Sequence, residues 1–552
     1  MSWVLSPEAI WRRLRRIINI AARGRIRIEP QDPGLWTQDS FLLRQFSMRR
    51  FLLLLSLIAP LALQAQGPLS GQVTDGQNAV PGVRVFVDDG IRAVDHHALA
   101  PSLRGYSWDI TGNDGRFSML GSAEDTHPVL VFEKDGWARD MVPMRNGANA
   151  TIVLRPANEY RVEKVLVVRL SFSDEPVTMP EDELRRLLFN RKPGQASAAN
   201  FLYEVSKGSL VLEEGAILNF TDPNHTKPRN DNQRADMVRL VLEKLKGQDL
   251  HDFDRVNNRT GALKPDGKPD HLWIFAPGEP KSITNNDAHL RPATFMMPLP
   301  WNASTTWPVV FMTEQAPLGN IVHESFHAMG EQSVDDLYLG CDGPNTAGIW
   351  DLMDAGQYRG WDAAHGDVGP WQIDTGYSPS HPGPWVTGEL WYNGRFKSLV
   401  RKERIKGSAW DGWIAPLERA PGIDSQRLVV PDPRKANSFW EFSVRRPWGF
   451  DRGRVGNRWG PGFEGLIVEY IDPGLLSRAG EPKGPVRIMD AHPRTPEPPQ
   501  PRFPCGRWEL DDAAFNLGDG EVSKGSDGPM SWEVISVDSF GSMRIQVKLK
   551  SQ

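Results

Sequence analysis

The chain has 552 residues, of which 24% are charged and 39% hydrophobic, a composition that excludes a disordered or membrane-embedded protein. A formal net charge of −5 gives no electrostatic reason to expect nucleic acid as a partner. The length favours about three domains. The 51 glycines and 45 prolines are typical of a turn-rich protein with much β structure.

Cysteine is scarce, with only Cys341 and Cys505 in the chain. Two cysteines cannot hold a fold of this size together, so hydrophobic cores must stabilise it. The two residues can pair in an oxidising compartment, but their spacing does not tell whether they meet.

The N-terminus has the pattern of a secretory signal. After an unpatterned stretch over residues 1–47, Met48-Arg49-Arg50 precedes an apolar run and the small residue Ala65. This order of basic, apolar and small residues is typical of a signal peptide. We expect residues 1–47 to be a non-native upstream extension, residues 48–65 to be the signal peptide, and the mature protein to be secreted or periplasmic. A membrane anchor is the alternative, but the run is short for a span and Pro60 interrupts it.

Residues 68–156 consist of short alternating runs separated by turns. Asp75-Gly76, Asp114-Gly115 and Asp135-Gly136 lie between such runs, and Asp-Gly is a strong turn signal. The pattern predicts a small β-sandwich. It resembles the transthyretin-like, carboxypeptidase regulatory-like domain that accompanies many exported bacterial enzymes. His96-His97 has no third ligand near it in sequence, so we expect a solvated loop there.

Residues 157–398 have a different texture. The runs VEKVLVVRLSF and HLWIFA have continuous apolar centres, as is typical of strands buried on both faces. Pro180–Glu183 opens a helix with an acidic first turn, and residues 231–246 have helical spacing. This mixture predicts an α/β or α+β domain.

Residues 399–552 return to strand-like runs, among them RLVVP, GLIVEYID and SMRIQVKLK. They predict a β-rich C-terminal domain. The proline-rich stretch over residues 492–504 is typical of an exposed loop. The whole chain is therefore predicted to be multidomain and α+β.

One helical segment carries a metal-ligand pattern, LGNIVHESFHAMGE. His323 and His327 are four residues apart, so both imidazoles project from one helix face and can bind one Zn²⁺. Glu324 can then take the proton of a water that the metal activates. The pattern predicts a zinc hydrolase with Glu324 as general base. The competing interpretation is a helix whose histidines only cap or pack.

The motifs around this helix resemble the immune inhibitor A family of secreted bacterial zinc metalloproteases. VLVVRLSFSD, FLYEVSKGSLVLEEG and PDGKPDHLWIFAPG resemble the segments that precede the family's site. WDLMDAG, with Met353, resembles the methionine turn beneath the metal in metzincin-like enzymes. FWEFSVRRPWGFD and GPGFEGLIVEYID resemble its C-terminal strands. The resemblance implies a metzincin-like catalytic domain that hydrolyses bonds inside a protein or peptide substrate without a covalent intermediate.

The third zinc ligand is where the chain departs from the family. The family's aspartate falls at Ser333, and serine is a poor zinc ligand at neutral pH. Asp336-Leu337-Tyr338 resembles the family's Asp-Leu-Tyr, which implies Asp336 as the ligand after a small loop insertion. Asp335 and Glu331 are the alternatives.

Some neighbouring residues are weaker candidates. Tyr338 and Tyr358 can hydrogen-bond a developing oxyanion, although aromatic residues near a site more often form its wall. His365 is expected to be solvated. Side-chain oxygens that could bind a calcium ion, our second candidate cofactor, are carried by Asp252, Asn257, Asp266 and Asp270. Their spacing is not that of an EF-hand loop.

Two rival functions remain open. The altered third-ligand spacing favours a catalytically silent scaffold that holds a surface glycan or protein. A zinc hydrolase acting on a substrate other than protein shares the metal and differs only in its substrate. The sequence predicts no stable membrane span in the mature chain, and it specifies neither cleavage preference, means of latency nor oligomeric state.

The signal peptide has a direct test. Because export removes residues 48–65, N-terminal sequencing of the exported protein should place the first residue close to Gln66. Intact protein that begins at Met1 and stays in the cytosolic fraction would contradict this expectation.

Overall fold

The computed structural model describes residues 69–88, 108–119, 129–143, 150–193, 195–281, 289–331, 334–337, 347–358, 378–422, 424–452, 462–475, 484–493 and 510–550. The expected upstream extension and signal peptide, both cysteines and His96-His97 lie outside these residues. Residues 66–552 form one compact unit. Within the described residues, no helix is both long enough and apolar enough to cross a membrane.

The first seven strands form two sheets that share one core. One sheet has the order β4-β1-β7 and the other β3-β2-β5-β6. The strands are β1 (Leu69–Thr74), β2 (Arg84–Asp88), β3 (Trp108–Ile110), β4 (Arg116–Met119), β5 (Val129–Glu133), β6 (Asp140–Pro143) and β7 (Ala150–Val153). Val73 and Phe117 of one sheet pack in a common cluster with Val85 and Phe132 of the other. The alternation in the sequence therefore corresponds to a β-sandwich.

A five-stranded sheet follows, in the order β11-β12-β10-β8-β9. Its strands are β8 (Arg161–Phe172), β9 (Leu210–Asp222), β10 (His271–Ala276), β11 (Ala293–Leu299) and β12 (Asn302–Thr313). Strands β9, β8, β10 and β12 run parallel, and β11 lies antiparallel at the edge beside β12.

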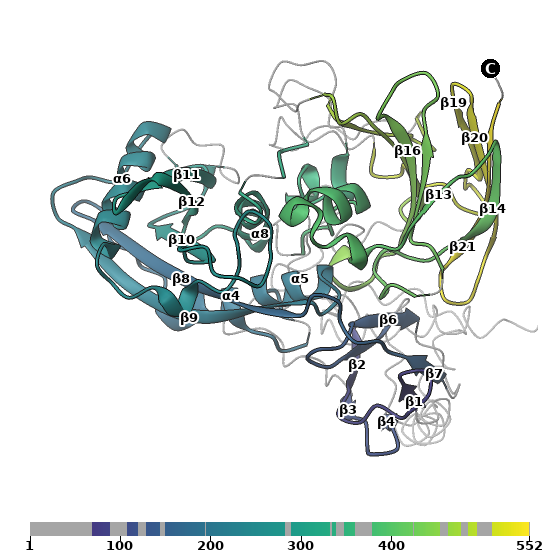
Figure 1. The fold of residues 1–552 in the computed structure, drawn as a ribbon, viewed down its shortest axis with the longest axis horizontal. Coiled ribbons are helices and arrows are strands. Elements are labelled where there is room, and N and C mark those ends of the chain that lie inside the picture. The colour runs from purple at the N-terminus through teal and green to yellow at the C-terminus, as the bar shows by residue number, and fades with distance from the viewer. Residues whose placement is uncertain are drawn as a thin grey trace, which may run out of the picture. The chain divides into compact units, whose positions relative to one another are not determined.

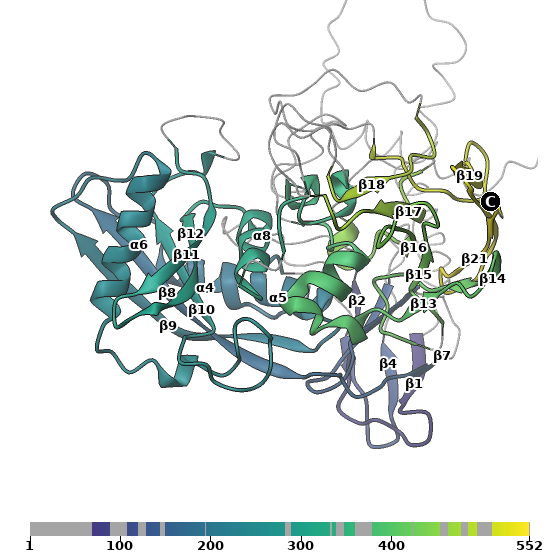
Figure 2. The same ribbon diagram turned by 45° about the horizontal axis from the view of Figure 1, so that its top comes forward.

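Four helices cover both faces of this sheet (Figures 1 and 2). They are α4 (Glu181–Phe189), α5 (Ala198–Val205), α6 (Asp231–Leu245) and α8 (Leu318–Ala328). Val165 and Val167 of β8 face the core that holds α4, α5 and α8, whereas Leu166 and Val168 face the core that holds α6. Burial on both faces explains why the strand is apolar without alternation.

The C-terminal part contains two antiparallel-rich sheets, β13-β15-β16-β17-β18 and β14-β21-β20-β19. The strands are β13 (Lys402–Arg404), β14 (Ala409–Ile414), β15 (Arg427–Pro431), β16 (Phe439–Arg445), β17 (Gly465–Ile471), β18 (Val486–Ile488), β19 (Lys524–Asp527), β20 (Met530–Val537) and β21 (Met543–Leu549). Phe442 and Val468 of the first sheet share a core with Trp532 and Ile545 of the second. The prediction of a strand-rich α+β chain with several sheets is confirmed.

Short helical turns connect these parts. They are η1 (His251–Phe253), η2 (Gly348–Trp350), η3 (Ala355–Tyr358), η4 (Val386–Leu390), η5 (Trp391–Gly394), η6 (Lys397–Leu399) and η7 (Gly449–Asp451).

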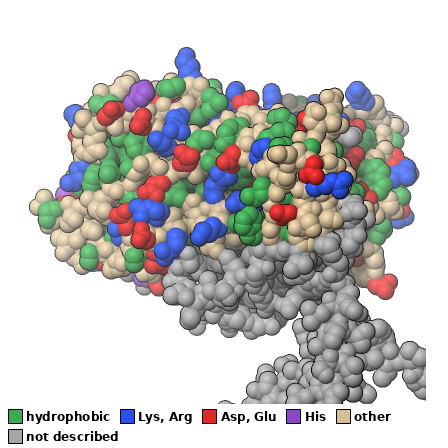
Figure 3. All heavy atoms as spheres, turned by 90° about the horizontal axis from the view of Figure 1, so that it is seen from below, with side chains coloured by type: hydrophobic (Ala, Val, Ile, Leu, Met, Phe, Trp, Pro, Cys, Tyr) green, Lys and Arg blue, Asp and Glu red, His purple; other side chains and the backbone are tan. Residues whose placement is uncertain are grey.

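Basic and acidic side chains are interspersed over the face drawn in Figure 3. That face therefore presents no field of a single sign among the described residues.

A buried ionic cluster joins α5 to the C-terminal part. Glu204 accepts hydrogen bonds from His381 Nε2 (2.8 Å) and the Phe450 amide (2.7 Å), and it pairs with Arg139 of the sandwich (3.0 Å). Arg445 pairs with Asp451 at 2.7 Å. Removing one partner would leave a buried charge uncompensated, so these contacts fix how the segments pack.

Glu418 is a further buried member of this cluster. Its Oε1 lies 3.3 Å from Arg445 Nε, and its carboxyl group also forms a side-chain hydrogen bond with Asp451. Burial, followed by the negative charge of Asp451, raises the pKa of Glu418 to about 8. The folded protein therefore keeps this carboxyl group protonated at neutral pH.

Replacing Glu418 by Gln should change how stability depends on pH. In the wild type the folded state holds a proton that the unfolded state releases near the ordinary glutamate pKa, so stability falls between about pH 5 and about pH 7.5. Glu418→Gln lacks this fall, so its Tm relative to wild type should rise by at least about 2 °C across that window. Glu243→Gln, exposed on α6, is the control for thermal melts. A pH-independent difference in Tm would contradict the assignment.

Candidate metal centre

Helix α8 presents the two histidines. It begins after Pro317, buries Ile321, Val322 and Phe326 against the core, and ends at Ala328. The chain then reverses, because Gly330 (φ 97°) and Glu331 (φ 53°) are both left-handed. Glycine adopts this conformation readily, and the reversal sends the chain back past the histidines.

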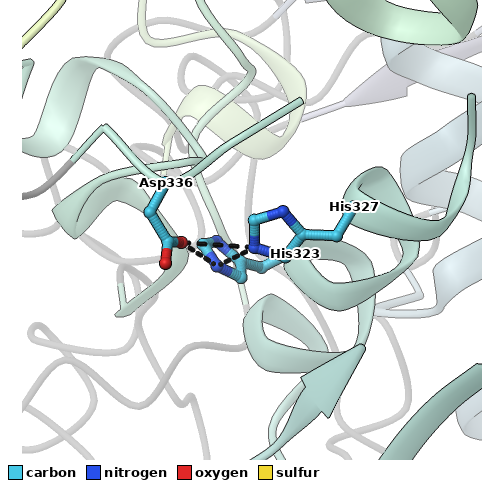
Figure 4. A group of neighbouring side chains, drawn as sticks. All are labelled: His323, His327 and Asp336. Carbon is cyan, nitrogen blue, oxygen red and sulfur yellow. Dashed lines mark hydrogen bonds and ion pairs between the residues drawn. The ribbon is translucent and has the colours of Figure 1, made fainter. Parts of the chain in front are cut away.

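Three side-chain atoms converge next to the helix (Figure 4). Asp336 Oδ1 lies 3.0 Å from His323 Nε2 and 3.2 Å from His327 Nε2. The two Nε2 atoms are 3.1 Å apart. A zinc ion with bonds of about 2.0–2.1 Å in tetrahedral geometry separates its ligand atoms by roughly 3.3 Å. The triangle therefore has the size that zinc requires.

The opposite ring nitrogens show which atoms carry hydrogen. His323 Nδ1 lies 3.1 Å from the Leu352 carbonyl oxygen, and His327 Nδ1 lies 2.7 Å from that of Val334. A carbonyl only accepts, so each Nδ1 must donate. In the neutral rings both Nε2 lone pairs then point at each other and at a carboxylate. Three electron-rich atoms this close together need a positive charge between them. Histidines that bind a metal are commonly oriented in this way, with the opposite ring nitrogen donating to a carbonyl group.

Electrostatics agree with this requirement. Burial alone would lower the pKa of His327, but the hydrogen bond and charge of Asp336 outweigh it and raise this pKa to about 9. Burial would likewise raise the pKa of Asp336, yet the hydrogen bonds from both histidines hold it well below its usual range. A proton can therefore supply the positive charge at this place, and a metal ion must displace that proton to bind.

The alternative third ligands lie elsewhere. Glu331 forms an ion pair with Lys268. The side chain of Asp335 is exposed, and Ser333 is outside the described residues. Asp336 is the carboxylate that the structure brings to the two histidines.

Glu324 lies beside these ligands on α8 and is largely buried. Thr294 Oγ1, from the edge strand β11, lies 2.8 Å from the Glu324 carbonyl oxygen and 3.0 Å from its Oε2. The single hydroxyl hydrogen of Thr294 can be donated to either atom. This contact restrains the carboxylate, and the sequence pattern gave no sign of it because thirty residues separate the two positions.

Met353 is fully buried in the core that contains α8. Its carbonyl accepts a hydrogen bond from the amide of Leu337, the residue after Asp336 (2.9 Å), and its own amide donates to Asp351 Oδ1 (2.7 Å). The methionine turn and the third-ligand segment are therefore joined by main-chain hydrogen bonds.

The candidate tyrosines divide between described and undescribed residues. Tyr358 is half-buried, and burial, followed by the negative charge of Asp336, raises its pKa. Its hydroxyl therefore stays protonated at neutral pH. Tyr338 and His365 lie outside the described residues.

Three of the four oxygen-bearing residues considered for calcium accept local hydrogen bonds, among them Asn257 from the amide of Thr260 (2.8 Å). Asp270 accepts hydrogen bonds from the amides of Arg255 and Val256, both at 2.9 Å. Asp266 accepts from the amide of Asn258 (3.0 Å), and Asp252 is exposed. In the described residues these side chains do not form a group of three carboxylate or imidazole ligands.

A second group of ligand-type atoms comes from His381, Glu418 and Asp451. Arg445 already contacts the carboxyl groups of both Glu418 and Asp451 there. This group is the ionic cluster described above, and its positive charge is supplied by the protein itself.

Removing the third ligand should weaken zinc binding. Asp336→Asn keeps the shape of the side chain but removes the negative charge, so zinc affinity should fall by more than about a hundredfold. Competition with a chromophoric chelator measures this directly. Asp335→Asn, one residue earlier and exposed, should bind zinc like the wild type. Equal affinity in Asp336→Asn would exclude Asp336 as a ligand.

Comparisons with known proteins assign no family. No protein-family model matches the chain, and no curated protein matches its sequence. The resemblance to immune inhibitor A therefore rests on the motifs of this chain.

Proposed function

We propose that the protein is an exported zinc-dependent endopeptidase that resembles the immune inhibitor A family. The observation that carries this proposal is the convergence of His323, His327 and Asp336 with Glu324 next to them on the same helix. Two histidines from a helix, one carboxylate from the following segment and an adjacent glutamate are the parts that metal-assisted hydrolysis needs.

Each residue has a chemical role in this proposal. His323, His327 and Asp336 would hold the ion, and bound zinc would supply Lewis acidity toward a carbonyl group and the attacking water. Glu324 accepts the proton of that water and then delivers it to the leaving amine. Thr294 keeps the Glu324 carboxylate in place during both transfers.

The edge strand β11 supports a polypeptide substrate. It pairs with β12 on one side, and among the described residues no strand pairs with its other edge. An open edge offers main-chain donors and acceptors to an extended peptide. Thr294, which contacts Glu324, belongs to this strand. A peptide added to the edge would therefore pass close to the general base. A small non-peptide substrate would have no need of an open strand edge.

The surrounding architecture supports a metzincin-like fold. A helix that carries both histidines and a buried methionine turn next to the Asp336 segment are the arrangements that the resemblance implies. We further propose that the N-terminal sandwich is transthyretin-like and that the chain is secreted or periplasmic.

The two rival functions predict different results. A silent scaffold should bind no stoichiometric zinc, or bind it without cleaving casein. A zinc hydrolase with another substrate should bind zinc and leave casein intact. The matched size of the ligand triangle favours a metal-binding protein over the scaffold.

The general base gives the sharpest test of activity. Glu324→Gln keeps size and hydrogen bonding but cannot accept a proton, so casein hydrolysis should fall by about two to four orders of magnitude. Zinc content, measured by metal analysis, should stay at the wild-type level. Glu213→Gln, exposed on β9, is the control. An unchanged rate in Glu324→Gln would remove this residue from the mechanism.

A further inference from the structure

The third ligand depends on a turn outside any regular element. His323 and His327 are fixed by α8, but Asp336 follows a reversal of the chain. We call Met329–Glu331 the exit turn. Gly330 and Glu331 are left-handed there, so this turn sets the direction in which the chain leaves the helix. Asp336 comes five residues after this turn, so the direction of the turn contributes to where its carboxylate lies.

A second segment, Trp391–Asn393, contacts the exit turn directly, and we call it the clasp. The Trp391 indole stacks on Phe326 of α8, with ring centroids 4.5 Å apart, and its Nε1 donates to Met329 Sδ at 3.2 Å. Asn393 Nδ2 donates to the Gly330 carbonyl oxygen at 3.2 Å. The clasp therefore contacts both the last turn of the helix and the turn that follows.

The clasp adopts a conformation that side chains disfavour. Tyr392 (φ 49°) and Asn393 (φ 52°) are consecutive left-handed residues, and neither is glycine. Such strain persists where the surroundings determine it, and it concentrates at functional sites. Asparagine tolerates this conformation better than most residues, and its amide supplies the donor.

The clasp is itself held by buried charge. The Tyr392 hydroxyl donates to Glu163 Oε2 at 2.7 Å, and Glu163 also pairs with His271 (2.6 Å) and Arg161 (3.2 Å). Glu163 and Arg161 are on β8, and His271 begins β10. The clasp is therefore tied to the central sheet. Through its contacts with the exit turn, the clasp connects the central sheet to the segment that leads to Asp336.

We propose that Asn393 is a positioning residue for the third zinc ligand, because its side chain fixes the exit turn that aims Asp336. This inference rests on the proposed zinc site. Asn393 is exposed, so its side chain contributes little to the core. Lys268 holds the other side of the same turn through its ion pair with Glu331. Together these contacts explain how a lengthened loop can still deliver a carboxylate to the metal.

The test uses the full chain and zinc alone. Asn393→Asp keeps the shape and tolerates the left-handed backbone, but it cannot donate to Gly330 or to the Arg259 carbonyl that the same amide contacts. Its zinc affinity should fall by about tenfold, the effect typical of residues that orient ligands. The visible spectrum of the cobalt-substituted protein should also change. Asn437→Asp is the control, since Asn437 is exposed and left-handed (φ 65°) away from the site.

A double-mutant cycle separates positioning from general structural support. If Asn393 acts through Asp336, the loss caused by Asn393→Asp should vanish in the Asp336→Asn background. A loss that persists there, or one matched by a lower Tm of the metal-free protein, would overturn the proposal. So would wild-type affinity in Asn393→Asp. If the wild-type chain itself fails to bind zinc stoichiometrically, the proposed function fails first and this inference with it.

Discussion

The site depends on an unfavourable arrangement of three electron-rich atoms. Two imidazole nitrogens and one carboxylate oxygen face one another at 3.0–3.2 Å. Because main-chain carbonyls take the hydrogen of each opposite ring nitrogen, neutral rings cannot relieve this repulsion themselves. A cation must. Protein groups that converge lone pairs in this way need a fold rigid enough to keep them together, and the surrounding structure supplies that rigidity.

The rigidity comes from main-chain contacts around the ligands. The carbonyl of Leu352 orients His323, and the next carbonyl, that of Met353, accepts from the amide beside Asp336. The segment Leu352–Met353 therefore holds both His323 and the segment that carries Asp336. This segment is buried in the same core as α8, so the ligands and their supports cannot move independently.

The loop between His327 and Asp336 is three residues longer than the resemblance to immune inhibitor A implies, and other segments of the chain contact its start. Extra residues in a loop cost little conformational entropy in themselves, but they reduce the precision with which a loop places its side chains. Here the chain gains external contacts where it leaves the helix, from Asn393 on one side and Lys268 on the other.

The sequence was sufficient to predict the strand-rich α+β character, the strands β8 and β10, the helix around residues 318–328 and the pair His323 and His327. These follow from local periodicity, which a linear pattern records. Other features depend on contacts between distant segments. The fold brings Asp336, which the resemblance already implied as the third ligand, to the two histidines and leaves its neighbour Asp335 exposed. It also places Thr294 against Glu324 and brings Asn393 to Gly330 across 63 residues. Contacts between distant segments depend on how sheets and turns pack, and no spacing in the sequence encodes them.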